Sequence, residues 1–313
     1  MVRRSGHPRR RQEPAGRAVD SRTFSVPPAD RLLSSGRPVY FKTVLIDAHF
    51  HADDLASIDP GFTDNYRDTG VLGLASVHDR AGLEATKRIM AGSGPCLTSF
   101  GLHPQLPVMD EADELAALAG SGAIAAIGEC GFDFFGDAPL RVRTPENERV
   151  QRQVFEFQLE LALRAGLPLV LHLRRADDLL FEYSPRLSRL PACILHSWPG
   201  PANEALDFLA RCPRALFSFG NSIVNGNNKA RSSAAALPES AILTETDAPY
   251  QPPRGHTPPG SRGFRRALLR AYSTTCDLPL VVAELATIRG QSVESIRTSV
   301  ESNFREAFAD ALR

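Results

Sequence analysis

Two histidines separated by one residue follow a short apolar run and could bind one metal ion together. His49 and His51 come after residues 44–46, Val-Leu-Ile, whose β-branched and apolar side chains predict a buried strand. Side chains two residues apart on a strand point to the same side, so both imidazoles can reach one ion. Imidazole is a good ligand for borderline divalent metals. Because such a pair is common by chance, the hypothesis of a metal site depends on the rest of the chain.

The same pattern, an apolar run that ends near a residue able to bind metal, recurs along the chain. We predict eight buried strands, at residues 44–46, 71–77, 97–100, 123–127, 169–171, 192–195, 215–219 and 241–244. A segment long enough for a helix follows each strand, and the longest helix is expected between Pro145 and Gly166. Eight strands alternating with helices are typical of a (β/α)8 TIM-type barrel of the α/β class.

Residues of metal-ligand type lie where five of these strands are expected to end. They are His49, His51, Glu129, His172, His196 and Asp247. Barrels of this class carry their chemistry at the carboxyl ends of the strands. Five of the eight histidines, these four and His103, lie at predicted strand ends rather than scattered over helices and loops. We therefore predict that the six ligand-type residues converge on a metal site.

This ligand set predicts two metal ions rather than one. Four histidines and two carboxylates are too many for one tetrahedral zinc ion, and they suit two ions that share a carboxylate. Glu129 is the natural bridge. Two ions about 3.5–4 Å apart can activate a water and stabilise an oxyanion leaving group. This arrangement suits phosphodiester cleavage as well as amide or ester hydrolysis, so the ligands alone leave the reaction open.

Charge is distributed unevenly along the 313 residues. Residues 1–40 contain nine Arg and three acidic residues, whereas the remainder contains 27 basic and 33 acidic residues. An acidic body does not bind nucleic acid through bulk charge, so a phosphate substrate would need metal ions or a few local arginines. No apolar run approaches the length of a membrane span, and we expect no membrane partner.

The cysteines indicate the redox compartment, and the composition of the N-terminal residues indicates where the folded domain begins. Five cysteines without a C-x-x-C pair argue against a zinc ribbon and a disulfide framework, and predict a reducing, cytoplasmic location. Residues 1–40 are basic and lack apolar periodicity, so we expect a disordered tail. Residues 41–313 are expected to form one barrel domain.

Several short motifs, in this order and spacing, resemble the TatD-type metal-dependent deoxyribonucleases, a branch of the amidohydrolase-like barrels. They are Asp-x-His-x-His at 47–51, Gly-x-His-Pro at 101–104, Gly-Glu-x-Gly-x-Asp at 128–133, His-x-Arg-x-Ala at 172–176 and Glu-Thr-Asp-x-Pro-Tyr at 245–250. The resemblance extends from Leu45 to Phe308. Amidohydrolases proper often bridge their metals with a carbamylated Lys after the fourth strand. Glu129 stands at that place here, which favours the nuclease branch.

The resemblance implies a hydrolase of DNA phosphodiesters that uses two Mg²⁺, Mn²⁺ or Zn²⁺ ions, often as a 3′ exonuclease. It assigns the ligands of one ion to His49, His51 and Asp247, those of the other to His172 and His196, and the shared position to Glu129. Asp247 could also take the proton of the attacking water. His103 and Arg174 would contact phosphate.

Other residues near the expected mouth of the barrel allow two interpretations. Arg262 belongs to a basic stretch from Arg254 to Arg270 that could track phosphates or be a solvated face. Trp198 could stack on a base or pack over the barrel mouth. Asp133 and Glu245 are expected to orient metal ligands rather than to bind metal.

Departures from the family pattern keep other functions open. The chain has Gln105 where the family often has a second His after His103-Pro104, and residues 197–200 are Ser-Trp-Pro-Gly in place of Cys-Phe-Ser-Gly. DNA is the predicted substrate, with RNA as an alternative. One rival function is hydrolysis of another ester or amide, such as a mischarged aminoacyl-tRNA. Another is a barrel subunit with mainly a binding role, against which the intact ligand set argues.

Overall fold

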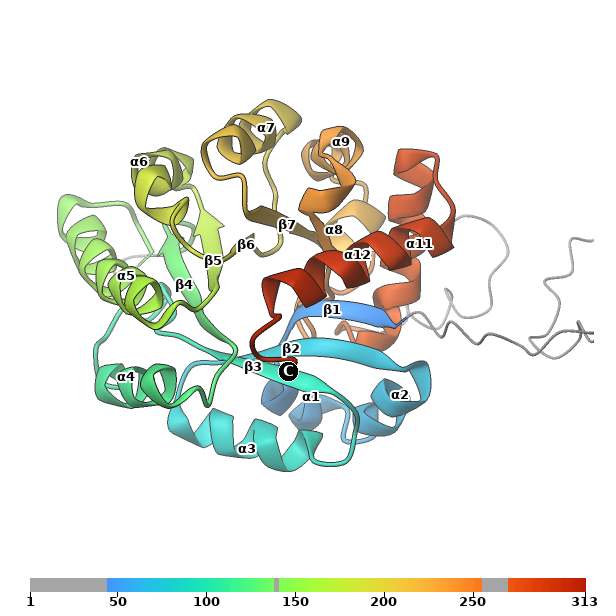
Figure 1. The fold of residues 1–313 in the computed structure, drawn as a ribbon, viewed down its shortest axis with the longest axis horizontal. Helices are drawn as coiled ribbons and strands as arrows, with labels where there is room; N and C mark the ends of the chain where they lie inside the picture. The colour runs from blue at the N-terminus through green and yellow to red at the C-terminus, as the bar shows by residue number, and fades with distance from the viewer. Residues whose placement is uncertain (1–43, 138–140, 255–269) are drawn as a thin grey trace, which may run out of the picture. The chain divides into compact units, whose positions relative to one another are not determined.

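Eight parallel strands follow one another around a single sheet in chain order, from β1 to β8. The structure is a computed structural model that describes residues 44–137, 141–254 and 270–313. The strands form a nearly closed barrel and the helices surround it (Figure 1). The prediction of a (β/α)8 TIM-type barrel is therefore confirmed. The tail expected at residues 1–40 lies outside the described residues.

The elements alternate as the sequence predicts. The strands are β1 (Leu45–Phe50), β2 (Val71–Val77), β3 (Cys96–Phe100), β4 (Ala126–Asp133), β5 (Leu169–Arg174), β6 (Cys193–Leu195), β7 (Ala215–Phe219) and β8 (Ile242–Thr244). The α-helices are α1 (Ala52–Ile58), α2 (Phe62–Thr69), α3 (Arg80–Met90), α4 (Ala112–Ser121), α5 (Pro145–Ala165), α6 (Asp177–Leu187), α7 (Ala202–Arg211), α8 (Asn221–Val224), α9 (Asn228–Ala236), α11 (Leu278–Arg289) and α12 (Val293–Ala307).

Strand β4 is the element that differs most from its prediction. It was expected to end before Glu129, but it continues to Asp133, so Glu129 lies inside the strand. Its register against β5 shifts between Ile127 and Cys130. Gly128 has a φ of 136°, and a Cβ there would lie 2.4 Å from the Val170 carbonyl oxygen. Glycine is needed for this irregular stretch, and glycine also lowers strand propensity, which is why the sequence pattern ended the strand too early.

Asp47 in β1 is hydrogen-bonded to Thr246, two residues after the end of β8. Its buried carboxylate accepts hydrogen bonds from the backbone N and from Oγ1 of Thr246, at 2.9 and 2.7 Å. Burial raises the pKa of Asp47 well above its usual value, and the two bonds from Thr246 partly offset that effect. The backbone N of Asp247 donates to the carbonyl of His49 at 2.9 Å. These bonds fix Asp247 relative to the His-x-His pair.

Helix α5 fixes the end of β4 and the loop after β3 through two buried glutamines on one face. Gln158 accepts from the backbone N of Leu102 at 2.8 Å and donates to the carbonyl of Leu102 at 3.0 Å. Gln151, two turns earlier, makes the same pair of bonds with the backbone of Asp133, at 2.9 and 3.0 Å. The helix thereby sets the position of Asp133 and of the residue that precedes His103.

All five cysteines are free thiols. Among the described helices, none combines the length and the apolar character that a membrane crossing needs.

Replacing Gln158 with Ala should lower the free energy of unfolding by about 2–4 kcal/mol, because the N–H and carbonyl of Leu102 would lose their partners in a buried place. Gln153→Ala, at an exposed position of the same helix, is the matched control and should stay within about 0.5 kcal/mol of wild type. Chemical denaturation of both variants measures the difference. Equal stability of the two variants would show that the Gln158 bonds do not hold the loop.

Candidate metal centre

Six histidine rings form a closed circle around the carboxylate of Glu129. In order around the circle they are His49, His51, His78, His103, His172 and His196. The centroids of neighbouring rings lie 4.1 to 5.6 Å apart. Strands β1, β2, β3, β5 and β6 supply these residues at or just beyond their carboxyl ends. The barrel thus brings together all the histidines that the sequence placed at strand ends, together with one that it did not, His78.

The two oxygens of Glu129 each face three imidazole nitrogens. Oε2 lies 3.2 Å from His49 Nε2, 3.7 Å from His51 Nε2 and 3.7 Å from His78 Nε2. Oε1 lies 2.7 Å from His172 Nδ1, 2.8 Å from His196 Nε2 and 3.3 Å from His103 Nε2. One carboxylate therefore stands between two separate sets of nitrogen atoms.

The spacing of these atoms suits divalent cations. Ligand atoms on a tetrahedral ion with bonds of about 2.1 Å are about 3.4 Å apart. Asp247 Oδ1 lies 3.7 Å from His49 Nε2 and 3.6 Å from His51 Nε2, close to that value. His49 Nε2 is buried and has no hydrogen-bond partner among the described residues. A buried polar atom without a partner is costly, and a cation would satisfy it. The donor set thus fits the metal ions that the sequence predicts.

Neighbouring side chains orient the imidazoles so that one nitrogen faces the centre. Ser76 Oγ lies 3.2 Å from His49 Nδ1, which leaves Nε2 facing the centre. Asp133 lies 3.0 Å from His172 Nε2, which leaves Nδ1 inward. Burial opposes ionisation of Asp133, but bonds from His172 and Gln105 lower its pKa to about 2. Asp133 therefore has the orienting contact expected of it.

Glu129 is held as a carboxylate by its neighbours. Burial alone would raise the pKa of Glu129, but electrostatic interaction with the surrounding imidazoles, His196 first among them, outweighs burial and holds the pKa well below its usual value. Burial would also raise the pKa of Asp247, but the hydrogen bond from His51 outweighs burial and lowers that pKa. Both groups are thus negatively charged and suited to bind cations.

Asp247 sits on a constrained backbone. Its φ is 54°, a left-handed conformation that is uncommon outside glycine and concentrates at functional sites. Gln251 Nε2 donates to Asp247 Oδ2 at 2.7 Å and to Ser197 Oγ at 2.6 Å. Ser197 and Gln251 also have positive φ values, 50° and 49°. The turn after β8 and the turn after β6 therefore combine to hold one oxygen of Asp247 while the other faces the histidines.

The predicted substrate contacts have different outcomes. Arg174 is exposed at the end of β5, and its guanidinium carbon lies 4.2 Å from the ring centroid of Phe135. Trp198 is only 1% exposed and donates from Nε1 to Ser233 Oγ at 3.1 Å, so its ring has no free face for a base. This position corrects the expected stacking role and favours the packing alternative. Arg262 lies outside the described residues.

Sequence reasoning missed three residues that the structure places near the centre. His78 directly follows Val77, the last residue of β2, so the strand-end rule could have found it. Gln251 follows the last motif by one residue but carries no recognisable signal of its own. Phe135 is 43% exposed two residues beyond Asp133, and exposure is visible only in the fold.

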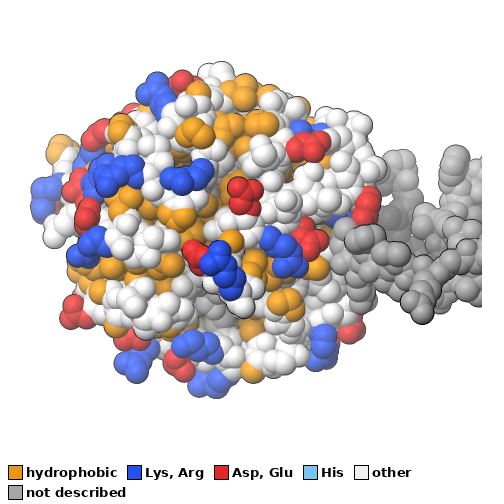
Figure 2. Space-filling model, viewed as in Figure 1, with side chains coloured by type: hydrophobic (Ala, Val, Ile, Leu, Met, Phe, Trp, Pro, Cys, Tyr) orange, Lys and Arg blue, Asp and Glu red, His pale blue; other side chains and the backbone are white. Residues whose placement is uncertain are grey.

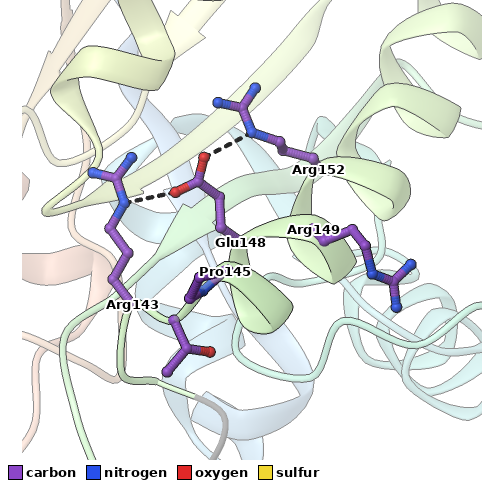
Figure 3. Close-up of a pocket in the computed structure, with 6 residues that line it drawn as sticks. Arg143, Pro145, Glu148, Arg149 and Arg152 are labelled. Carbon is purple, nitrogen blue, oxygen red and sulfur yellow. Dashed lines mark hydrogen bonds and ion pairs between the residues drawn. The ribbon is translucent and has the colours of Figure 1, made fainter.

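A surface pocket at the start of α5 is a weaker candidate for binding (Figure 3). The Glu148 carboxylate lies between Arg143 and Arg152 and pairs with both, each at 2.9 Å. Arg149, which also lines the pocket, pairs with Glu146 at 2.6 Å. Its three arginines are therefore already neutralised by carboxylates, so we assign the pocket no phosphate.

Comparison with known proteins agrees with this geometry. The family model described as TatD related DNase matches residues 46–309, nearly all of the barrel. The chain belongs to the TatD-related DNase family. The predicted family, and with it the class of metal-dependent nucleases, is thereby confirmed.

Individual relatives of the TatD family cover most of the chain. The "3'-5' ssDNA/RNA exonuclease TatD" of Dickeya dadantii is 32% identical over 258 residues, which are 79% of this chain and 90% of that protein. The protein of the same name from Erwinia billingiae is 32% identical over 260 residues, covering 77% and 89%. The crystal structure of YJJV, a TatD homologue from Escherichia coli, superposes with a TM-score of 0.70 over 85% of this chain and 98% of that one, at 24% identity. The last comparison supports the fold.

Glu129→Gln should reduce the bound divalent metal to less than half of the wild-type content, because the carboxylate charge between the two sets of nitrogens is lost. Asp133→Asn keeps all six assigned ligands but weakens the contact that orients His172, and should weaken metal binding by about 10- to 100-fold. Glu84→Gln, on an exposed part of α3, is the control. Metal analysis after dialysis measures all three. Full metal content in Glu129→Gln would contradict its place at the centre.

Proposed function

We propose that this chain is a two-metal 3′–5′ exonuclease that cleaves single-stranded DNA, with RNA as a second substrate. The observation that carries the proposal is the division of Glu129 between two sets of imidazole nitrogens, with Asp247 beside one of them. The relatives named as 3'-5' ssDNA/RNA exonucleases support the substrate and the polarity.

The proposed ligands follow the two sides of Glu129. One ion is assigned to His49, His51 and Asp247, the other to His172 and His196, and Glu129 is shared. When bound, two Mg²⁺, Mn²⁺ or Zn²⁺ ions supply the activation of a water and the neutralisation of charge on the phosphate.

Asp247 is the proposed proton acceptor. Its Oδ1 faces the His-x-His pair, and Gln251 holds its Oδ2. The lowered pKa keeps the carboxylate ionised before the attack, which is the state that a general base requires. Asp247 can therefore take a proton from the attacking water without reorienting its side chain.

His103 is the proposed donor to the scissile phosphate. The backbone N of Gln105 donates to His103 Nδ1 at 3.1 Å, so in the neutral ring the proton resides on Nε2. That N–H points toward the Oε1 side of Glu129 and is 3.3 Å from it. A phosphate oxygen at this side would receive a hydrogen bond. The backbone of residue 105 thus fixes the tautomer of His103.

Phe135 and two arginines offer a platform for a base of a single strand. The exposed ring of Phe135 has the guanidinium of Arg174 at 4.2 Å and that of Arg175 at 4.7 Å from its centroid. Aromatic rings and guanidinium planes both stack on bases of any sequence. The platform begins two residues after Asp133, which orients His172, and so lies beside the metal centre.

Local contacts of this kind suit a barrel whose sequence, residues 41–313, contains more acidic than basic residues. On the face in Figure 2, Lys and Arg side chains are interspersed with Asp and Glu. Nucleic acid would therefore bind through the metal centre and the nearby arginines. The free cysteines support the reducing, cytoplasmic location predicted for the chain.

Asp247→Asn should lower kcat on end-labelled single-stranded DNA by about 100- to 10,000-fold, since it removes the proton acceptor and weakens one metal position. Wild-type protein with Mg²⁺, Mn²⁺ or Zn²⁺ should release mononucleotides from the 3′ end of DNA. The same assay offers 5′-blocked and 3′-blocked DNA, RNA and an aminoacyl-tRNA. Wild-type kcat in Asp247→Asn would disprove the assigned role. Hydrolysis of the aminoacyl ester with both nucleic acids intact would replace the proposed function by the rival one.

Phe135→Ala should raise KM for single-stranded DNA by about 5- to 100-fold and leave kcat nearly unchanged, because stacking on one base contributes about 1–3 kcal/mol to binding. Leu206→Ala removes another exposed apolar side chain, on α7, and serves as the control. Steady-state kinetics on one oligonucleotide separate the two parameters. A fall in kcat without a change in KM would instead show that Phe135 helps to position the metal ligands and does not stack on a base.

A further inference from the structure

His78 and His103 occupy corresponding positions on the two sides of Glu129. His78 Nε2 lies 3.7 Å from Oε2, and His103 Nε2 lies 3.3 Å from Oε1. Their rings are neighbours, with centroids 4.9 Å apart. Together with Glu129 they form one of the groups whose ligand atoms are close enough to hold a cation. Neither histidine belongs to the ligand set assigned above, so the function of each depends on which nitrogen carries its proton.

The outer nitrogens of the two rings have opposite partners. His78 Nδ1 lies 3.2 Å from the carbonyl oxygen of Gly101. A carbonyl can only accept, so Nδ1 must carry the proton and Nε2 presents a lone pair to the centre. His103 Nδ1 accepts from the backbone N of Gln105, so its Nε2 carries the proton. Two similar positions therefore offer a metal ligand on one side and a hydrogen-bond donor on the other.

The barrel fixes the carbonyl that orients His78. The backbone N of Gly101 donates to the carbonyl of Val77 at 3.1 Å. This bond continues the β2–β3 pairing one residue beyond the end of β3. A Cβ on Gly101 would lie 2.6 Å from backbone atoms of Gly128. Only glycine permits this close approach of the β3 loop to the β4 stretch that carries Glu129. The orientation of His78 is thus a property of the backbone around the centre.

We propose that His78 is a further metal ligand, with Nε2 binding the ion on the Oε2 side of Glu129. The proposal rests on the two-metal function above. That ion then has three imidazoles, from His49, His51 and His78, whereas the other ion has two. Imidazole favours Zn²⁺ strongly over Mg²⁺, which prefers oxygen ligands and water. His78 therefore makes the Oε2 side a zinc-selective position.

The matched variants are His78→Asn and His103→Asn. The asparagine amide reaches about as far as Nδ1, so it can still donate to Gly101 or accept from Gln105, while the atom at Nε2 is removed. Metal-free wild type and both variants are titrated separately with Zn²⁺ and with Mg²⁺ by calorimetry. The visible absorption of Co²⁺-loaded protein reports the ligand environment independently of activity.

His78→Asn should weaken the binding of one Zn²⁺ ion by at least about tenfold, lower the ratio of Zn²⁺ to Mg²⁺ affinity and change the Co²⁺ spectrum. His103→Asn should keep the zinc affinity and the spectrum. The affinity ratio does not depend on the folded fraction, so it tests the proposal even if a variant is less stable. An unchanged ratio in His78→Asn, or an equal loss in both variants, would overturn the assignment. Fewer than two ions in wild type would instead contradict the two-metal function itself.

Discussion

A buried carboxylate inside a circle of imidazoles is the interaction on which the rest of this molecule depends. Glu129 is 3% exposed, and its charge is tolerated because six histidine rings surround it. Without those rings, or the cations they fit, burying this charge would cost several kcal/mol. The same arrangement gives the carboxylate two chemically distinct sides. One feature thus serves the stability of the barrel centre and offers two sets of ligand atoms to cations.

The supporting structure keeps that circle in place from two directions. Asp47 binds Thr246 across the seam between β8 and β1, and so fixes Asp247 against the His-x-His pair. On the opposite side, Gln151 of α5 binds the backbone of Asp133 at the end of β4, and Gln158 binds the backbone of the loop that carries His103. Both devices use buried side chains that bond to backbone groups. Buried bonds of this kind are costly to break, so the positions of the ligands are set by the scaffold.

The chemistry of each imidazole depends on a neighbour outside the centre. Ser76 and Asp133 contact the outer nitrogens of His49 and His172, and the Gly101 carbonyl does the same for His78, so the other nitrogen of each ring faces Glu129. The backbone N of Gln105 instead donates to Nδ1 of His103, so the proton of that ring is on the nitrogen that faces Glu129. Histidines at equivalent places around one carboxylate can thus present either a lone pair, which suits a metal ion, or an N–H group, which suits a phosphate oxygen. The division follows from which atom each ring meets at its second nitrogen.

Sequence alone predicted the barrel and the convergence of ligand-type residues, because apolar periodicity and strand-end position are local properties that parallel strands bring to one end. The order and spacing of short motifs predicted the family. The sequence placed His49, His51, His172, His196 and Asp247 correctly at the barrel mouth. It ended β4 before Glu129, because glycine reads as a break where the tertiary structure needs close backbone approach. Only the fold decided that Trp198 is buried, that Phe135 is exposed and which nitrogen of His78 faces Glu129. Exposure and tautomer depend on neighbours distant in sequence, such as Ser233 for Trp198, and no local pattern encodes them.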